Sequence, residues 1–173
     1  MTDHFALLGE ARRPWLDSEE LKERYFALSR TEVPSAELNE AFRVLSDPKL
    51  RLQHLLKLEG VDLAAGRAVP PAVAEVFWNT GTLLRETQRW RLRQGAATST
   101  LARALLQPER GKLAQRLEEL ETQLRAMYDA ELAGLSAAPN ESAPALLEAY
   151  DRISYLTRLL EQLAEQRFQL SLA

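Results

Sequence analysis

The sequence predicts an all-α protein made of a small helical hairpin domain followed by a three-helix bundle. Leu, Ala, Glu, Gln and Arg dominate the 173 residues, there are only 7 glycines, and β-branched residues never alternate over the length of a strand. Apolar residues instead recur at spacings of three and four, the period of an amphipathic helix. A chain of this length can bury a substantial core if its helices pack together.

The start of the chain predicts a short helix and then a longer one. One apolar turn at residues 4–8 closes at Gly9, and glycine readily adopts the left-handed backbone with which many helices end. Asp17 is followed three residues later by Glu20, a capping-box pattern that predicts the start of a second helix. Apolar residues at three- and four-residue spacing carry this helix through Leu28.

A turn at residues 31–35 connects this helix to a third one and folds the two into an antiparallel hairpin. Pro34 marks the bend, because proline disfavours helical geometry at the preceding Val33 and lacks the N–H group that a helix interior needs. Ser35 can cap the third helix by accepting a backbone N–H group. Turn chemistry alone therefore accounts for these three residues.

The third helix is expected to stop before Asp47 and Pro48. Aspartate there can cap a fourth helix and proline suits its first position, and this fourth helix is expected to end at Gly60. Residues 61–69 then lose the helical period, so we place a domain boundary in this segment. The predicted domains are 1–66 and 67–173.

The second domain is expected to contain three helices. The first begins at the Pro70-Pro71 pair and runs to about Arg93. The second is expected to be kinked or broken at Pro108, because a proline in a helix interior costs roughly 3 kcal/mol, and a loop is expected at 134–140. The third follows that loop. Each helix has one apolar stripe, and burying these stripes against one another predicts a three-helix bundle.

Composition argues against several classes of function. The chain has no cysteine, which rules out disulfides, thiolate metal sites and thiol nucleophiles. His4 and His54 have no second ligand at metal-binding spacing, and no nucleophile accompanies the acidic pairs, so we expect no catalytic residue, no metal and no cofactor. No apolar run approaches the roughly 20 residues that span a bilayer. We therefore expect a soluble, cytoplasmic protein that is not an enzyme and does not bind membranes.

Arginines close to tryptophans suggest nucleic-acid binding as an alternative. Four arginines lie between residues 85 and 93, near Trp78 and Trp90. Glu86 within this group and the net charge of -3 favour a solvated face instead, so we expect no nucleic-acid partner. Binding to nucleic acid would appear as an affinity that falls steeply with salt.

Three short motifs are distinctive. They are an aromatic-x-Leu-x-Gly start at Phe5 to Gly9, a Leu-Asn-x-Ala third helix at Leu38 to Ala41, and the combination of Leu45, Pro48, Arg51 and Leu55 to Gly60. Together they resemble the HscB-type J-domain co-chaperones of iron–sulfur cluster assembly, with His54 standing in for a tyrosine of the family. The resemblance covers nearly the whole chain and keeps the order of its parts. It implies a J-domain-like first domain followed by a C-terminal three-helix bundle.

The resemblance also implies two partners, because the family delivers iron–sulfur scaffold proteins to a DnaK-like ATPase. The family's His-Pro-Asp tripeptide, through which a J domain stimulates ATP hydrolysis, falls here on Val33, Pro34 and Ser35. Valine has no ring nitrogen and serine has no carboxylate, so these side chains cannot reproduce the polar contacts of the tripeptide. Basic residues of the second helix are interleaved with glutamates, which predicts weak docking. We therefore expect a degenerate, inactive chaperone loop.

A second partner-binding site is implied on the bundle. Val76 and Phe77 match two apolar positions of the family's first bundle helix, and Tyr155 matches an aromatic residue of the last one. Thr80 and Gly81 fall where the family carries leucine and glutamate. Because Val76 and Phe77 belong to a run of three apolar residues on a helix, at least one must point away from a single buried stripe, so binding and core roles are both open. Packing and binding roles are also both open for Tyr155.

These observations predict an HscB-like co-chaperone that recognises a client or scaffold protein through the bundle face. The alternative is a structural or assembly protein that kept the fold, lost the chaperone cycle and acts only through protein–protein contacts. Such a protein could self-associate through exposed parts of its leucine stripes. Size-exclusion chromatography with light scattering discriminates between them, since a monomer would weaken the assembly alternative.

Overall fold

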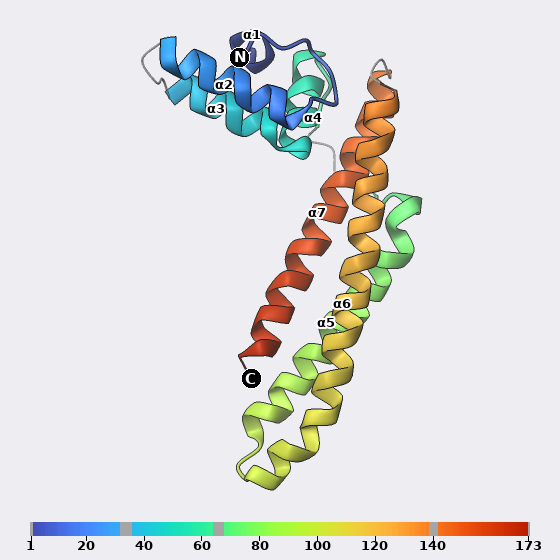
Figure 1. Ribbon diagram of the computed structural model, residues 1–173. Helices are drawn as coiled ribbons and strands as arrows, with labels where there is room; N and C mark the ends of the chain where they lie inside the picture. Colours follow the sequence, from blue (N-terminus) through green and yellow to red (C-terminus); the bar gives the residue numbers. More distant parts are fainter. Residues whose placement is uncertain (1, 32–35, 64–67, 139–141, 173) are drawn as a thin grey trace. The chain divides into compact units, whose positions relative to one another are not determined.

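The structure is a computed structural model and describes residues 2–31, 36–63, 68–138 and 142–172. These residues form seven α-helices and no strand, which confirms the predicted all-α class (Figure 1). The helices are α1 (His4–Leu7), α2 (Ser18–Thr31), α3 (Ala36–Ser46), α4 (Pro48–Leu58), α5 (Pro71–Ala96), α6 (Thr100–Ala137) and α7 (Ala143–Ser171).

The chain divides into two compact units. One comprises Met1–Ala68 and Ala130–Ile153, and the other comprises Val69–Asp129 and Ser154–Ala173. The first unit therefore contains α1 to α4 together with the end of α6 and the start of α7. The second contains α5 and the rest of α6 and α7. The predicted domain boundary, between residues 66 and 67, lies outside the described residues and stays a prediction.

In the first unit α3 is the central helix, because α1, α2 and α4 all contact it. Its inner side carries Leu38, Ala41 and Leu45, each at most 3% exposed. The phenol of Tyr25 on α2 donates a hydrogen bond of 2.7 Å to Asn39 on α3, and its ring stacks on Phe42 with centroids 4.3 Å apart. These contacts join the two helices of the predicted hairpin, which lie side by side in Figure 1.

Caps and left-handed glycines end these helices where the sequence predicts. The Asp17 carboxylate accepts two backbone N–H groups of the first turn of α2 at 2.8 and 3.0 Å. Asp47 accepts one at the start of α4 at 2.9 Å, ahead of the proline at the first helical position. Gly9 and Gly60 have φ of 67° and 76°, a backbone that glycine adopts without strain.

Arg51 is a buried cation on α4, 4% exposed. Its Nε donates to the carbonyl of Pro14 at 2.9 Å, and its Nη1 donates to the carbonyl of Leu45 at 2.7 Å. Buried carbonyl groups cost free energy when they lack a donor. The guanidinium therefore ties α4 both to the end of α3 and to the segment that precedes α2.

His54 is a second buried polar residue of α4, 6% exposed. Its Nε2 accepts the backbone N–H of His4 at 3.1 Å, and the two imidazole rings lie 4.4 Å apart. A ring nitrogen that accepts a hydrogen bond carries no proton. Burial of the ring, and to a lesser extent the charge of the neighbouring His4, lower the pKa of His54 below its ordinary value.

This geometry predicts that acid destabilises the wild type more than a His54→Gln variant. The folded pKa lies below the unfolded value of about 6.5, so the unfolded chain takes up more protons below that pH. The contribution of the neutral ring is therefore complete above pH 6.5 and is lost as the pH falls. Glutamine keeps an acceptor for the His4 N–H group but does not titrate. Urea unfolding at pH 7.5 and pH 5.5 measures the difference, and equal losses in both proteins would contradict the assignment.

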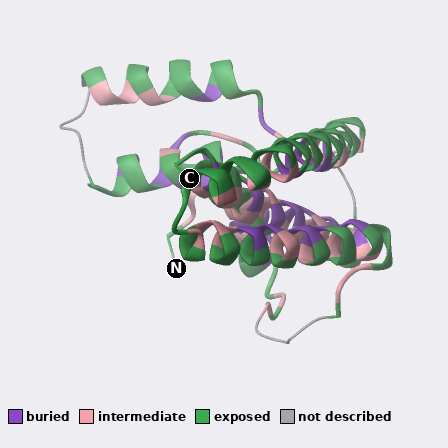
Figure 2. Ribbon diagram, turned by 90° about the horizontal axis from the view of Figure 1, so that it is seen from below, coloured by how far each residue is buried: buried purple, intermediate pink, exposed green. Residues whose placement is uncertain are grey.

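The second unit buries its leucine stripes in one core. Figure 2 shows the buried positions on the inner sides of the bundle helices. The core residues are Val73, Val76, Leu83 and Trp90 of α5, Leu113, Leu117, Leu120 and Leu124 of α6, and Leu156, Leu159, Leu163 and Leu170 of α7.

The break expected at Pro108 is wrong, because α6 runs without interruption from Thr100 to Ala137 with the proline inside it. The helix also includes residues 134–137, where a loop was expected. The indole Nε1 of the buried Trp90 donates to the carbonyl of Leu106 at 3.0 Å, and the side chain of Leu106 packs against the bundle core. These contacts with α5 offset the local cost of the proline.

Candidate partner-binding face

The three consecutive apolar residues of α5 face three different environments. Successive residues of a helix are turned by about 100°, so they cannot share one side. Val76 is 3% exposed and belongs to the core, which favours the core role for this residue. Phe77 is half-buried at the edge of that core, and Trp78 is 67% exposed.

Aromatic rings from α5 and α7 meet beside the core. The rings of Phe77 and Tyr155 meet edge to face, with centroids 6.4 Å apart and planes at 86°. Phe77 and Trp78 make a second edge-to-face pair at 5.8 Å and 79°. Such pairs contribute roughly 0.5–1.5 kcal/mol beyond the burial of their area. The three residues form one partly exposed surface, which we call the aromatic face.

Thr80 and Gly81, which follow the aromatic face on α5, offer no exposed side chain that a partner could bind. Thr80 is fully buried, and its hydroxyl donates to the carbonyl of Val76 at 2.7 Å. Gly81 has no side chain, and a Cβ there would come no closer than 3.6 Å to the Arg85 side chain, which is ordinary contact. A partner on this surface would therefore meet mainly the aromatic rings.

The predicted chaperone loop at Val33, Pro34 and Ser35 lies outside the described residues and stays a prediction. Two of the three cations of α2, Lys22 and Arg24, form ion pairs within the molecule. Lys22 pairs with Glu19 at 2.7 Å on the same helix. Arg24 pairs with Glu10 at 3.0 Å and donates to the carbonyl of Gly9 at 2.7 Å. These bonds reduce the positive charge that α2 can offer to a partner.

Trp78 belongs to the aromatic face but is not among the partner-binding residues that the sequence predicts. The signal is the run of three apolar residues, of which one must point to solvent. The sequence does not say which one, because that depends on where α6 and α7 pack. The structure places the buried side on Val76 and the exposed side on Trp78.

The remaining features give little support to other kinds of site. Trp90 is 0% exposed and cannot stack on a nucleotide base, and Arg93 is paired with Glu109. Among residues 2–31, 36–63, 68–138 and 142–172, no three acidic or histidine side chains are grouped to hold a metal ion. Within the same ranges, no helix combines the length and apolar character that crossing a membrane requires.

Comparison with known proteins identifies the class of protein. Over 142 residues the chain is 30% identical to the co-chaperone protein HscB homolog of Bordetella pertussis, with 68% of this chain and 78% of that protein covered. The homologs from Bordetella parapertussis and Bordetella bronchiseptica match to the same extent. In fold the chain resembles chaperone HscB from Vibrio cholerae, with a TM-score of 0.64, 18% identity and coverage of 98% and 99% of the two chains. No family model matches the sequence.

These matches define a helical co-chaperone, a class of proteins that are not enzymes. The chain belongs to the HscB co-chaperone family. The fold match extends over nearly the full length of both chains, which supports an HscB-like all-helical fold for the described residues.

Proposed function

We propose that this protein is a co-chaperone of iron–sulfur cluster assembly that binds a scaffold-like client through the aromatic face and no longer stimulates a DnaK-like ATPase. The observation that carries the proposal is the set of edge-to-face rings of Phe77, Trp78 and Tyr155. Phe77 and Tyr155 are positions at which the family resemblance implies scaffold contacts. Membership of the HscB family supports the general co-chaperone role.

The chemistry of the aromatic face suits protein recognition. Aromatic residues are enriched at protein interfaces and dominate their binding energy, because one rigid ring buries a large area at low entropic cost. Trp78 leaves most of its ring available, while Phe77 and Tyr155 are held against the core. Because Thr80 is buried and Gly81 carries no charge, the contact rests on apolar area. We therefore expect client binding that depends only slightly on salt.

The proposed loss of ATPase stimulation rests on the residues at 33–35 and on α2. Val33 and Ser35 replace the histidine and aspartate of the family tripeptide. The ion pairs of Lys22 and Arg24 further weaken docking. Both features act in the same direction, so the first domain would no longer act as an activator of the ATPase.

Titration of an iron–sulfur scaffold protein into wild type and a Trp78→Ala variant tests client binding. We expect the variant to bind at least about tenfold more weakly, since an interfacial aromatic hot spot contributes 2 kcal/mol or more. Phe26→Ala is the matched control, because Phe26 is an aromatic residue 56% exposed on α2. Wild type without affinity for the scaffold, or a Trp78→Ala variant that binds as wild type does, would contradict the proposal.

Self-assembly is a second candidate function. The observation in its favour is that several large apolar side chains stay exposed, among them Leu101 at 72%, Phe168 at 57% and Leu172 at 68%. Light scattering after size-exclusion chromatography distinguishes the two functions. A monomer at high concentration counts against self-assembly.

A further inference from the structure

A groove of about 750 Å³ lies between α5 and α6, away from the aromatic face. Phe77 and Glu86 lie nine residues apart on α5, which places them on opposite sides of the helix at about 100° per residue. The groove is lined by Glu86, Arg89, Leu92, Arg93, Glu109, Lys112, Leu113 and Arg116. None of its lining residues belongs to the aromatic face, so this surface is independent of the proposed client site.

The charges of the groove do not balance. Two ion pairs connect its walls, one between Arg93 and Glu109 and one between Arg116 and Glu86. They neutralise both carboxylates of the lining. Two more exposed cations, Arg89 and Lys112, have no ion-pair partner within the described part of the chain. The groove is therefore positive, although the whole chain carries a net charge of -3.

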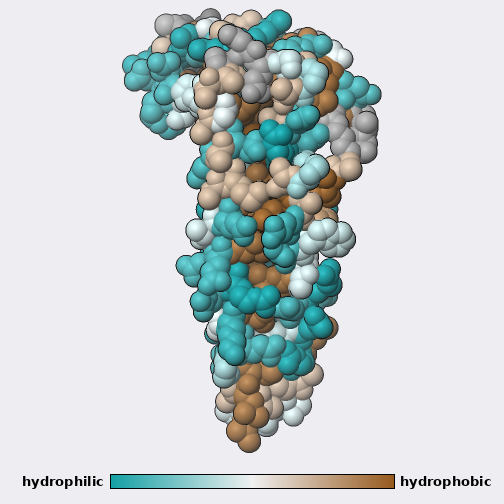
Figure 3. All heavy atoms as spheres, turned by 90° about the vertical axis from the view of Figure 1, so that its right-hand side faces the viewer, coloured by the Kyte–Doolittle hydropathy of each residue, from teal (hydrophilic) through white to brown (hydrophobic). Residues whose placement is uncertain are grey.

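Exposed leucines adjoin these cations. Leu92 lines the groove and is 68% exposed. On α6, Leu101 and Leu105 are each 72% exposed. Spacings of four, four and three residues place them on the same side of the helix as Glu109 and Lys112, so they continue the α6 wall of the groove. Figure 3 shows apolar surface at the end of the bundle where α5 gives way to α6.

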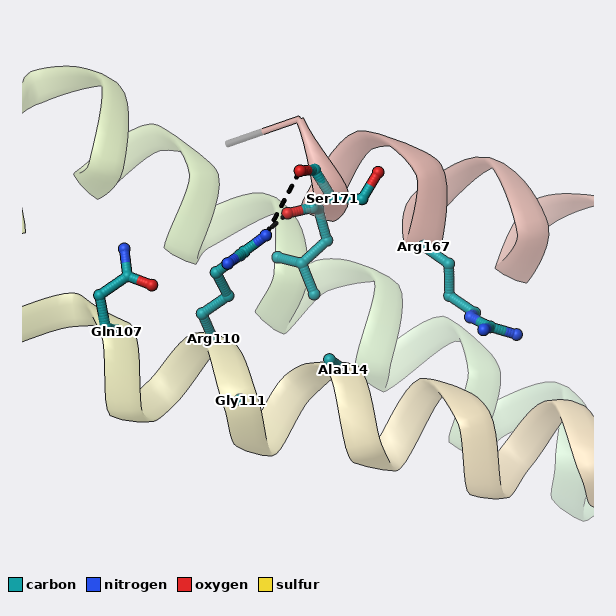
Figure 4. A pocket seen from close by; sticks show the side chains of 7 residues that line it. Gln107, Arg110, Gly111, Ala114, Arg167 and Ser171 are labelled. Atoms are coloured by element: carbon teal, nitrogen blue, oxygen red, sulfur yellow. Dashed lines mark hydrogen bonds between the residues drawn. The ribbon is translucent and has the colours of Figure 1, made fainter.

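In a second groove, by contrast, the arginines already have hydrogen-bond or ion-pair partners within the protein. It measures about 520 Å³ and lies where α7 ends against α6 (Figure 4). There Arg110 donates to the carbonyls of Leu170 and Ser171 at 3.0 and 3.4 Å, and Arg167 pairs with Glu121. Arg110 therefore caps the end of α7, and Arg167 joins α7 to α6. The unbalanced positive charge belongs to the α5–α6 groove.

We propose that the α5–α6 groove docks an acidic amphipathic helix of a partner protein. Carboxylates of that helix would pair with Arg89 and Lys112, and its apolar side chains would cover Leu92, Leu101 and Leu105. This occupant matches the groove in both charge and apolar character. A nucleic acid matches it less well, because two carboxylates line the groove and the exposed side chains beside the cations are aliphatic.

A synthetic helical peptide tests the proposal by fluorescence anisotropy. The peptide has leucine at every third or fourth position and glutamate beside each leucine, over roughly 15 residues, the length at which an isolated helix becomes stable. We expect Arg89→Glu combined with Lys112→Glu to weaken binding at least about tenfold, and Leu101→Ser with Leu105→Ser to do the same. Arg13→Glu with Lys57→Glu changes the net charge equally at exposed positions outside the groove and should leave the affinity unchanged. Trp78→Ala should also leave it unchanged.

Four outcomes would overturn the proposal. The first is no binding of the acidic peptide, and the second is equal binding of a peptide with lysine in place of glutamate. The third is a dimer of this chain that the Arg89→Glu and Lys112→Glu pair dissociates, since the occupant would then be a second copy. The fourth is a single-stranded oligonucleotide that binds more tightly than the peptide and loses its affinity steeply with salt.

Discussion

Trp90→Ala is expected to lower the free energy of unfolding of the bundle by about 3–5 kcal/mol, the cost of deleting a large buried aromatic side chain. Trp90 is 0% exposed in the core of the second unit. Its indole also donates to the carbonyl of Leu106 at 3.0 Å, two residues before the proline inside α6. Alanine would leave a cavity and would remove the hydrogen bond that joins α5 to α6. A loss of this size is a large part of the roughly 5–15 kcal/mol of a typical domain.

Two further variants separate the causes of this effect. Trp90→Phe keeps most of the ring but removes the N–H group, so it should cost only about 1–3 kcal/mol. Trp78→Ala removes the same residue type from an exposed position of the same helix and should cost only about 0.5–1.5 kcal/mol, the contribution of its edge-to-face pair with Phe77. Urea unfolding followed by far-UV circular dichroism measures all three. A Trp90→Ala variant as stable as Trp78→Ala would contradict the assignment of Trp90 to the core.

A variant carrying Val33→His and Ser35→Asp is expected to stimulate single-turnover ATP hydrolysis by a DnaK-type chaperone, whereas wild type leaves the rate at its basal value. The two substitutions restore an imidazole and a carboxylate to the tripeptide, and each charged hydrogen bond is worth roughly 1.5–3 kcal/mol. A tenfold increase in rate requires only about 1.4 kcal/mol. Because Lys22 and Arg24 are engaged in ion pairs, the stimulation should need a high concentration of the variant.

The matched control carries Val33→Ala and Ser35→Ala, which changes the same positions without adding either polar group. We expect it to behave as wild type does. Stimulation by wild type would show that the loop is active and refute its proposed degeneracy. If neither wild type nor the histidine and aspartate variant stimulates, the protein has left the chaperone cycle, and the search for partners moves to the bundle.

The ends of most helices follow from the sequence because they depend on residues close in the chain. The Asp17 and Asp47 carboxylates cap α2 and α4 within three residues of their own positions. Gly9 and Gly60 supply left-handed backbone where the apolar period stops. The leucine stripes likewise predict a bundle, since a helix with one apolar side must bury it against another helix. Local chemistry therefore determined the fold class and the order of the helices.

The continuity of α6 was decided by tertiary structure. Pro108 alone predicts a kink or a break, but Trp90 and Leu106, 16 residues apart, meet across the two helices. No local rule contains that contact, because it exists only after α5 and α6 pack. The energy of packing then offsets a local cost of roughly 3 kcal/mol.

For the aromatic face and the α5–α6 groove too, the sequence predicts part of the surface and tertiary packing decides the rest. The sequence by itself determined that three apolar residues follow one another on α5 and that arginines gather further along the helix. Only the packing of α7 decided that Phe77 meets Tyr155 while Trp78 stays exposed. Only the packing of α6 against α5 decided that Arg93 pairs with Glu109 and that Arg116 pairs with Glu86. The physical reason is that periodicity tells which side of a helix is apolar, whereas exposure and charge balance depend on residues that other helices bring to that side.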